Sequence, residues 1–170
     1  MTRFWVEPAG DARAVATAAI EAGADALVAT PGSAVPTLAR LPVLLRTPDA
    51  VTGEGVQATV VVVRSPVEQA AARAVVERGG TVVVETPDWR VIPLENLVAW
   101  SRAAGGEVVA VVADAATARL ALGTLETGVH GILLRTADPT EVARCGRVLA
   151  ERAAEPVSYT HLTLPTNREV

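Results

Sequence analysis

Short runs of β-branched apolar residues alternate along most of the chain with segments whose apolar positions recur at helical spacing. Valine-rich runs of this kind are typical of strands that are buried on both faces of a parallel sheet. Helices that follow such strands cover the two faces. Seven runs are predicted strands: Arg3–Glu7, Ala26–Thr30, Pro42–Arg46, Ala58–Arg64, Thr81–Glu85, Glu107–Val112 and Gly131–Arg135.

Amphipathic segments fill most of the intervals between these strands. Apolar residues lie three or four positions apart in four of them: Asp11–Ala22, Pro66–Arg78, Ala115–Thr127 and Pro139–Ala153. Glycine follows the first three segments directly, as is common at helix C-termini. Ser65, Asp114 and Asp138 precede three of the segments and are predicted helix caps.

This order of elements predicts an α/β fold, a parallel (β/α) barrel-like domain over residues 1–156. Seven strands at short intervals fit an incomplete (β/α)8 barrel. No G-x-G-x-x-G motif occurs, which argues against a dinucleotide-binding fold. A flavodoxin-like open sheet remains an alternative, because periodicity does not show closure. The third unit is weak, since residues 48–55 read as a turn-rich loop.

Composition narrows the function classes. The net charge is −4 with no basic stripe, which argues against a nucleic-acid partner. Charged residues interrupt every apolar run, so no membrane span is expected. Cys145 is the single cysteine, which excludes an internal disulfide, and the absence of lysine excludes a Schiff base within this chain. We expect a cytoplasmic protein that acts on a small molecule; oligomeric state is left open.

The last residues differ in composition from the rest. Segment 157–170 holds the chain's one tyrosine, one of its two histidines and one of its two asparagines. It resembles translated sequencing adapter, and a genuine terminus is the alternative. We therefore predict a non-native tail and exclude it from functional reasoning.

Polar residues are densest in segment 82–99. A valine-rich strand ends at Glu85, Asp88 follows in a turn, and Glu95 and Asn96 lie in the first turn of a helix expected to open at Pro93. In barrels and in open α/β sheets, sites are built at the C-terminal ends of strands.

This segment is similar to a signature of the 3-dehydroquinate synthase II family: an acid, then Asp-Trp, then Ile-Pro-Leu-Glu-Asn-Leu. Segments 19–28 and 125–134 also resemble strands of that family, with His130 where aspartate is usual. The resemblance is collinear over about residues 3 to 153, and Asp88–Asn96 is its most specific part. Pro66 stands where the family usually has a lysine.

The resemblance implies an enzyme of aromatic amino acid biosynthesis. Family members convert 2-amino-3,7-dideoxy-threo-hept-6-ulosonate to 3-dehydroquinate, in an alternative shikimate route, by NAD-dependent oxidative deamination and cyclisation. A bacterial branch forms an aminohydroxybenzoate from a related amino sugar acid with a divalent metal such as Mn²⁺. The family continues into a C-terminal domain that is missing here. A fragment that is inactive alone, or a non-catalytic truncated barrel, is thus also expected.

Glu85, Asp88 and Asn96 are the candidate catalytic residues. Glu85 and Asp88 could serve as a base or bind a metal, and Asn96 could hydrogen-bond to substrate. The alternatives are that Asp88 caps a turn and that Glu85 pairs with an arginine. Glu95 is a candidate substrate-binding residue, although an acid in a first helical turn is stabilised there without any catalytic purpose.

Three arginines end predicted strands and are candidate ligands for a substrate carboxylate or phosphate. They are Arg46, Arg64 and Arg135. Arginine binds such groups through two parallel N–H donors. The sequence identifies no residues that bind NAD or a metal.

Overall fold

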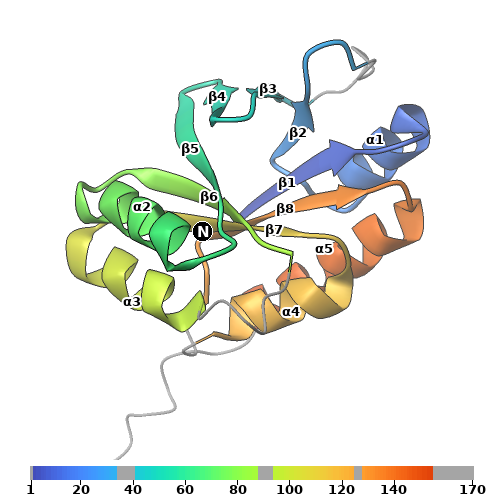
Figure 1. Cartoon of the computed structure of the whole chain (residues 1–170). Coiled ribbons are helices and arrows are strands. Elements are labelled where there is room, and N and C mark those ends of the chain that lie inside the picture. Colours follow the sequence, from blue (N-terminus) through green and yellow to red (C-terminus); the bar gives the residue numbers. More distant parts are fainter. Residues whose placement is uncertain (1, 34–40, 88–93, 125–127, 155–170) are drawn as a thin grey trace, which may run out of the picture.

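The computed structural model describes residues 2–33, 41–87, 94–124 and 128–154 (Figure 1). Within them, eight strands form a closed barrel whose order around the wall follows the chain. The predicted tail, 157–170, lies outside the described residues. The strands are β1 (Arg3–Pro8), β2 (Ala26–Ala29), β3 (Val43–Arg46), β4 (Ala50–Gly53), β5 (Val56–Val62), β6 (Thr81–Glu85), β7 (Glu107–Val112) and β8 (Gly131–Thr136).

The barrel closes where β1 pairs with β8. Six consecutive residues of β1 align with β8 in parallel, from Arg3 opposite Gly131 to Pro8 opposite Thr136. The open-sheet alternative is therefore wrong. Closure removes both sheet edges, which leaves no unpaired row of backbone groups for another chain to join.

The prediction of seven strands was wrong, because the predicted loop 48–55 contains β4. This strand pairs antiparallel with both β3 and β5, while the other neighbouring strands pair in parallel. Glu54 and Gly55 connect β4 to β5, and both have positive φ angles. A two-residue turn with two positive φ angles matches the twist of a β-hairpin. A hairpin thus takes the place of the third strand–helix unit.

Five helices lie in the described residues and pack on the outside of the barrel (Figure 1). Ser65 and Asp114 accept hydrogen bonds from first-turn N–H groups of the second and fourth helices, and Asp138 accepts one from Thr140, which confirms the three predicted caps. Asp11 caps the first helix in the same way. The helices are α1 (Ala12–Glu21), α2 (Pro66–Glu77), α3 (Leu94–Ala104), α4 (Ala115–Gly123) and α5 (Pro139–Ala154).

Alternation along the strands divides the core into two clusters. The outer cluster lies between the barrel and the helices and includes Val82, Val84 and Leu134. The inner cluster fills the barrel with Trp5 and with aliphatic residues that include Leu44, Val83 and Leu133. The interior is therefore packed, and a ligand has access to the ends of the barrel and not to its centre.

The N-terminal end of the barrel carries its own polar contacts. Arg3 forms an ion pair with Glu107, with 3.0 Å between Nη2 and Oε1. His130 accepts a hydrogen bond from the backbone N–H of Val108 through Nδ1. Burial lowers the pKa of His130; the charge of Glu107 opposes this effect, and the charge of Arg3 adds a smaller lowering. These contacts suit His130 to a structural role at this end of the barrel.

None of the helices among the described residues combines the length and the apolar character that crossing a bilayer requires.

Candidate functional site

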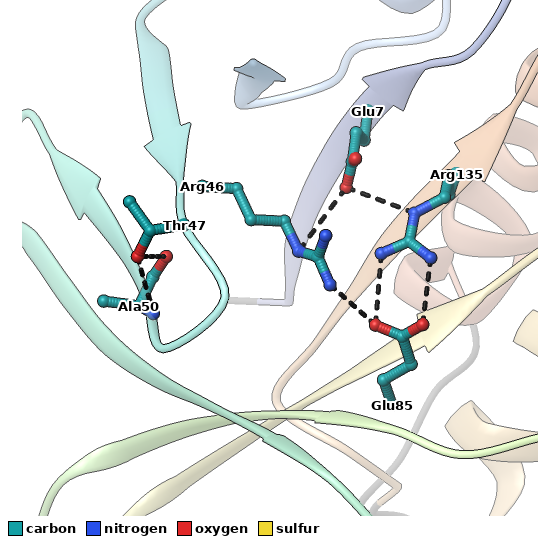
Figure 2. A network of polar contacts seen from close by, with 6 residues as sticks. All are labelled: Glu7, Arg46, Thr47, Ala50, Glu85 and Arg135. Atoms are coloured by element: carbon teal, nitrogen blue, oxygen red, sulfur yellow. Dashed lines mark hydrogen bonds and ion pairs between the residues drawn. The ribbon is translucent and has the colours of Figure 1, made fainter. Parts of the chain in front are cut away.

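Four charged side chains meet at the C-terminal end of the barrel, and we call them the mouth layer. They are Glu7 of β1, Arg46 of β3, Glu85 of β6 and Arg135 of β8 (Figure 2). Three of them are predicted site residues, which the fold brings together from distant parts of the sequence. Glu7 was not predicted.

Strand alternation places these side chains on the inner face. Each follows, by two positions, a residue of the inner cluster: Trp5, Leu44, Val83 and Leu133. Because side chains two apart in a strand point to the same side, the mouth layer covers the apolar interior. It lies at the end of the barrel where barrel enzymes build their sites.

Glu85 is the centre of the contacts. Arg135 donates two hydrogen bonds to it, from Nη1 to Oε2 at 3.0 Å and from Nη2 to Oε1 at 3.2 Å. Arg46 donates a third, from Nη2 to Oε1 at 2.6 Å. A paired, forked geometry of this kind is stronger and more directional than a single ionic contact.

Glu7 completes the group from the opposite side. Its Oε1 lies 3.4 Å from Nε of Arg135 and 3.7 Å from Nε of Arg46. The residue is 7% exposed, the most buried carboxylate of the layer. Each arginine thus contacts both glutamates, and the two positive charges offset the two negative charges.

These contacts fix the protonation of Glu85. The hydrogen bonds from Arg135 lower the pKa of Glu85 below its ordinary value, and the charges of Arg46 and Arg64 add to the effect, while partial burial opposes it. The same pairing raises the pKa of Arg135. A carboxylate with a lowered pKa is a weak base, so the geometry suits Glu85 to hold the arginines in place.

Arg64 lies at the mouth outside this network. It follows the end of β5, and Val62, two residues before it, aligns with Glu85. Its backbone N–H donates to Glu68 of α2, and Ser65 also donates to Glu68. In the described part of the chain, no ion pair involves the guanidinium of Arg64, which is exposed.

Glu95 and Asn96 are not part of the mouth layer. Glu95 and Asn96 are exposed in the first turn of α3. Asp88 lies outside the described residues. The catalytic assignments of these residues therefore stay predictions.

One sequence signal could have identified Glu7. It is the single charged residue between Phe4 and Pro8, and strand alternation places it on the side opposite Val6. A carboxylate in an otherwise apolar strand is rarely buried without a partner. The partners, however, come from β3 and β8, so their identity required the closed barrel.

The described residues do not fit a divalent metal. Among them, no group of three or more His, Cys, Asp or Glu residues converges. The carboxylates of Glu7 and Glu85 already face guanidinium groups, which would repel a cation.

The described residues also offer no evident site for the pyrophosphate of NAD. Such a group commonly binds free N–H groups at a helix N-terminus. The N-termini of α1, α2 and α4 are capped by Asp11, Ser65 and Asp114, and Glu141 accepts from the first residue of α4. The acid Glu68 lies against the start of α2.

Cys145 of α5 is buried, and burial raises the pKa of its thiol to about 12. A thiol of this kind packs as a small apolar residue and is a poor nucleophile.

Comparisons with known proteins give the family. Residues 1–149 match the profile described as the 3-dehydroquinate synthase II N-terminal domain. The chain is 42% identical over 154 residues to 3-dehydroquinate synthase of Methanoculleus marisnigri, covering 91% of this chain and 45% of the relative. It is 36% identical over 154 residues to a 3-dehydroquinate synthase homolog of Aquifex aeolicus, covering 89% and 44%.

A third relative, 3-dehydroquinate synthase of Methanoregula boonei, is 40% identical over 142 residues, which cover 84% of this chain and 41% of the relative. The chain thus spans slightly less than half the length of these curated relatives. With the matched profile covering most of its residues, the chain belongs to the 3-dehydroquinate synthase II family.

Proposed function

We propose that this chain forms the barrel half of an enzyme that makes 3-dehydroquinate. In that reaction 2-amino-3,7-dideoxy-threo-hept-6-ulosonate loses its amino group by NAD-dependent oxidation and then cyclises. Family membership supports the activity. The observation that carries the position of the site is the mouth layer, which groups three predicted residues with Glu7 at the C-terminal end of the barrel.

The contacts of the three arginines suggest that they have different roles within this site. Arg46 and Arg135 are held by Glu85 and Glu7, so binding an anion through them would require breaking existing pairs. Arg64 is exposed and could bind the substrate carboxylate at no such cost. In this proposal Arg64 anchors the substrate, and the mouth layer forms a fixed polar floor beneath it.

The proton-transfer step is assigned to residues of the segment that follows β6 in the sequence. Asp88 and Asn96 remain the proposed catalytic residues, Asp88 as a base and Asn96 as a hydrogen-bond partner of the substrate. Glu85 acts in the proposal by orienting Arg46 and Arg135. Glu95 remains a proposed substrate contact. In this proposal, NAD binds to the part of the enzyme that the relatives have beyond this chain.

The experiment is an assay of this chain continued by the second half that its relatives have. The amino sugar acid and NAD are supplied, and NADH is followed by its absorbance. NADH formed together with 3-dehydroquinate is the expected result. An aminohydroxybenzoate formed with Mn²⁺ and no NADH would instead assign the metal-dependent chemistry. A folded enzyme with neither product would overturn the catalytic proposal.

Arg64→Gln tests the anchor in the same assay. We expect KM for the amino sugar acid to rise about tenfold or more, with a smaller change in kcat, because a ground-state contact is lost. Arg102→Gln, on the last turn of α3, is the matched control and should leave both constants unchanged. Asp88→Ala and Asn96→Ala should lower kcat; near-normal turnover would make both residues part of the scaffold.

A further inference from the structure

Glu7 has an unusual environment for a carboxylate in an ion-pair group. Its Oε1 and the Nε atoms of Arg46 and Arg135 are all buried without a hydrogen-bond partner. The distances of 3.4 and 3.7 Å are ionic contacts, and the carboxylate oxygen lies between the two guanidinium groups (Figure 2). Glu85, by contrast, accepts three hydrogen bonds from the same two arginines.

Glu85 and Glu7 therefore have different roles: Glu85 orients the two arginines, whereas Glu7 balances their charge. Among the described residues, Arg46 and Arg135 donate all of their side-chain hydrogen bonds to Glu85. A buried carboxylate oxygen without a hydrogen bond is costly, and Glu7 orients the two arginines less than Glu85 does. What Glu7 does supply is its charge. Without it, the mouth layer would have two positive groups against one negative group.

The charge balance bears on which ligands the mouth accepts. With Glu7 present, the mouth layer is neutral, and Arg64 is the exposed positive group beside it. Without Glu7, a second uncompensated positive charge would lie at the barrel axis. A dianion gains more than a monoanion from an added positive charge, because the interaction scales with the product of the charges.

We propose that Glu7 is a specificity-determining residue. Its charge keeps the mouth layer neutral, so that the mouth takes a ligand with one carboxylate and rejects dianions such as phosphate. The inference rests on the proposed function only in taking the mouth as the ligand site. Rejection is achieved by removing a favourable interaction from the wrong ligand, which is one of the two routes to specificity.

The test is a binding titration of the chain itself, without turnover. Wild type and Glu7→Gln are titrated with inorganic phosphate, at a pH at which phosphate is mainly a dianion, and with acetate. Binding is followed by NMR through the Nε–H signals of Arg46 and Arg135. The matched control is Glu107→Gln, which removes a glutamate from an ion pair with Arg3 at the opposite end of the barrel.

We expect Glu7→Gln to bind phosphate about tenfold more tightly than wild type, with shifts at both arginine signals, because one buried positive charge is uncovered. Acetate affinity should change less. Glu107→Gln should behave like wild type. Equal phosphate affinities in wild type and Glu7→Gln, or an equal gain in Glu107→Gln, would overturn the proposal.

A second variant decides the case if circular dichroism shows that Glu7→Gln does not fold. Glu85→Gln removes the same charge from the mouth layer and must also increase phosphate affinity. No increase there would overturn the charge-balance argument. Because neither titration uses NAD or turnover, their outcome is independent of whether the proposed reaction is found.

Discussion

Arg135 and Glu85 form a two-bond ion pair across the mouth of the barrel, although β7 separates their strands. Nη1 and Nη2 of Arg135 lie 3.0 and 3.2 Å from the two carboxylate oxygens of Glu85. The two side chains therefore meet across the inside of the barrel and not between neighbouring strands of its wall. Because Arg46 reaches the same carboxylate from β3, Glu85 links three separate strands at the end where the site is proposed.

Glu85→Gln should lower stability at neutral pH, and the loss should shrink in acid. The pKa of Glu85 in the folded state is below its ordinary value of 4.5. Its stabilising effect is therefore fully present above about pH 4.5 and is lost as the pH falls through the lowered pKa.

Urea unfolding of wild type and Glu85→Gln at neutral pH and near pH 3 measures this effect. Glu77→Gln, in an exposed ion pair with Arg73, is the matched surface control. The same destabilisation of Glu85→Gln at both pH values would contradict the assigned cause.

Arg135→Lys should destabilise the chain although it keeps the charge. A single ammonium group cannot reproduce two parallel bonds to Glu85 together with the contact to Glu7. We expect a loss of about 1–3 kcal/mol in the free energy of unfolding. Arg144→Lys, at an exposed arginine that pairs with Glu141 of α5, should cost less than about 0.5 kcal/mol. Equal losses would show that the forked geometry has no energetic value.

Gly106→Ala should be strongly destabilising. A Cβ atom at this position would lie 2.5 Å from the carbonyl oxygen of Val76 and 2.7 Å from its Cα atom, and backbone atoms cannot move aside cheaply. We expect a loss of about 1–3 kcal/mol, as for overpacking in general.

Gly123→Ala is the matched substitution at a glycine whose Cβ would meet nothing within 4 Å. Since alanine reduces the freedom of the unfolded chain, it should be neutral or stabilising by up to about 1 kcal/mol. Thermal unfolding of both variants measures the contrast. A Gly106→Ala protein as stable as wild type would mean that β7 and α2 do not approach as closely as described.

Cys145 should react with a thiol reagent only after unfolding. With the pKa raised to about 12, the thiolate fraction at pH 8 is on the order of one in ten thousand, and the side chain is also buried. Colour release from a chromogenic disulfide reagent should be very slow for the native chain and complete in concentrated urea. Rapid reaction of the native chain would show that α5 opens readily.

The sequence predicted most of the secondary structure, because residues that face the core recur at the spacing of a strand or a helix. All seven predicted strands exist within two residues of their expected ends, and four helices follow the predicted amphipathic segments. The strand-end positions of Glu85, Arg46 and Arg135 were also readable, since each closes an apolar run. The family signature was also readable, because it lies within one short segment of the chain, 82–99.

Only the tertiary structure decided closure, the eighth strand and the composition of the mouth. Residues Ala50–Gly53 carry weak strand signals, and pairing on both sides with β3 and β5 makes them a strand. Glu7 gave no sign of its partners, because Arg46 and Arg135 lie far along the chain. Periodicity reports which face of an element is buried, whereas the register between strands sets which side chains meet, and that register depends on contacts between residues distant in sequence.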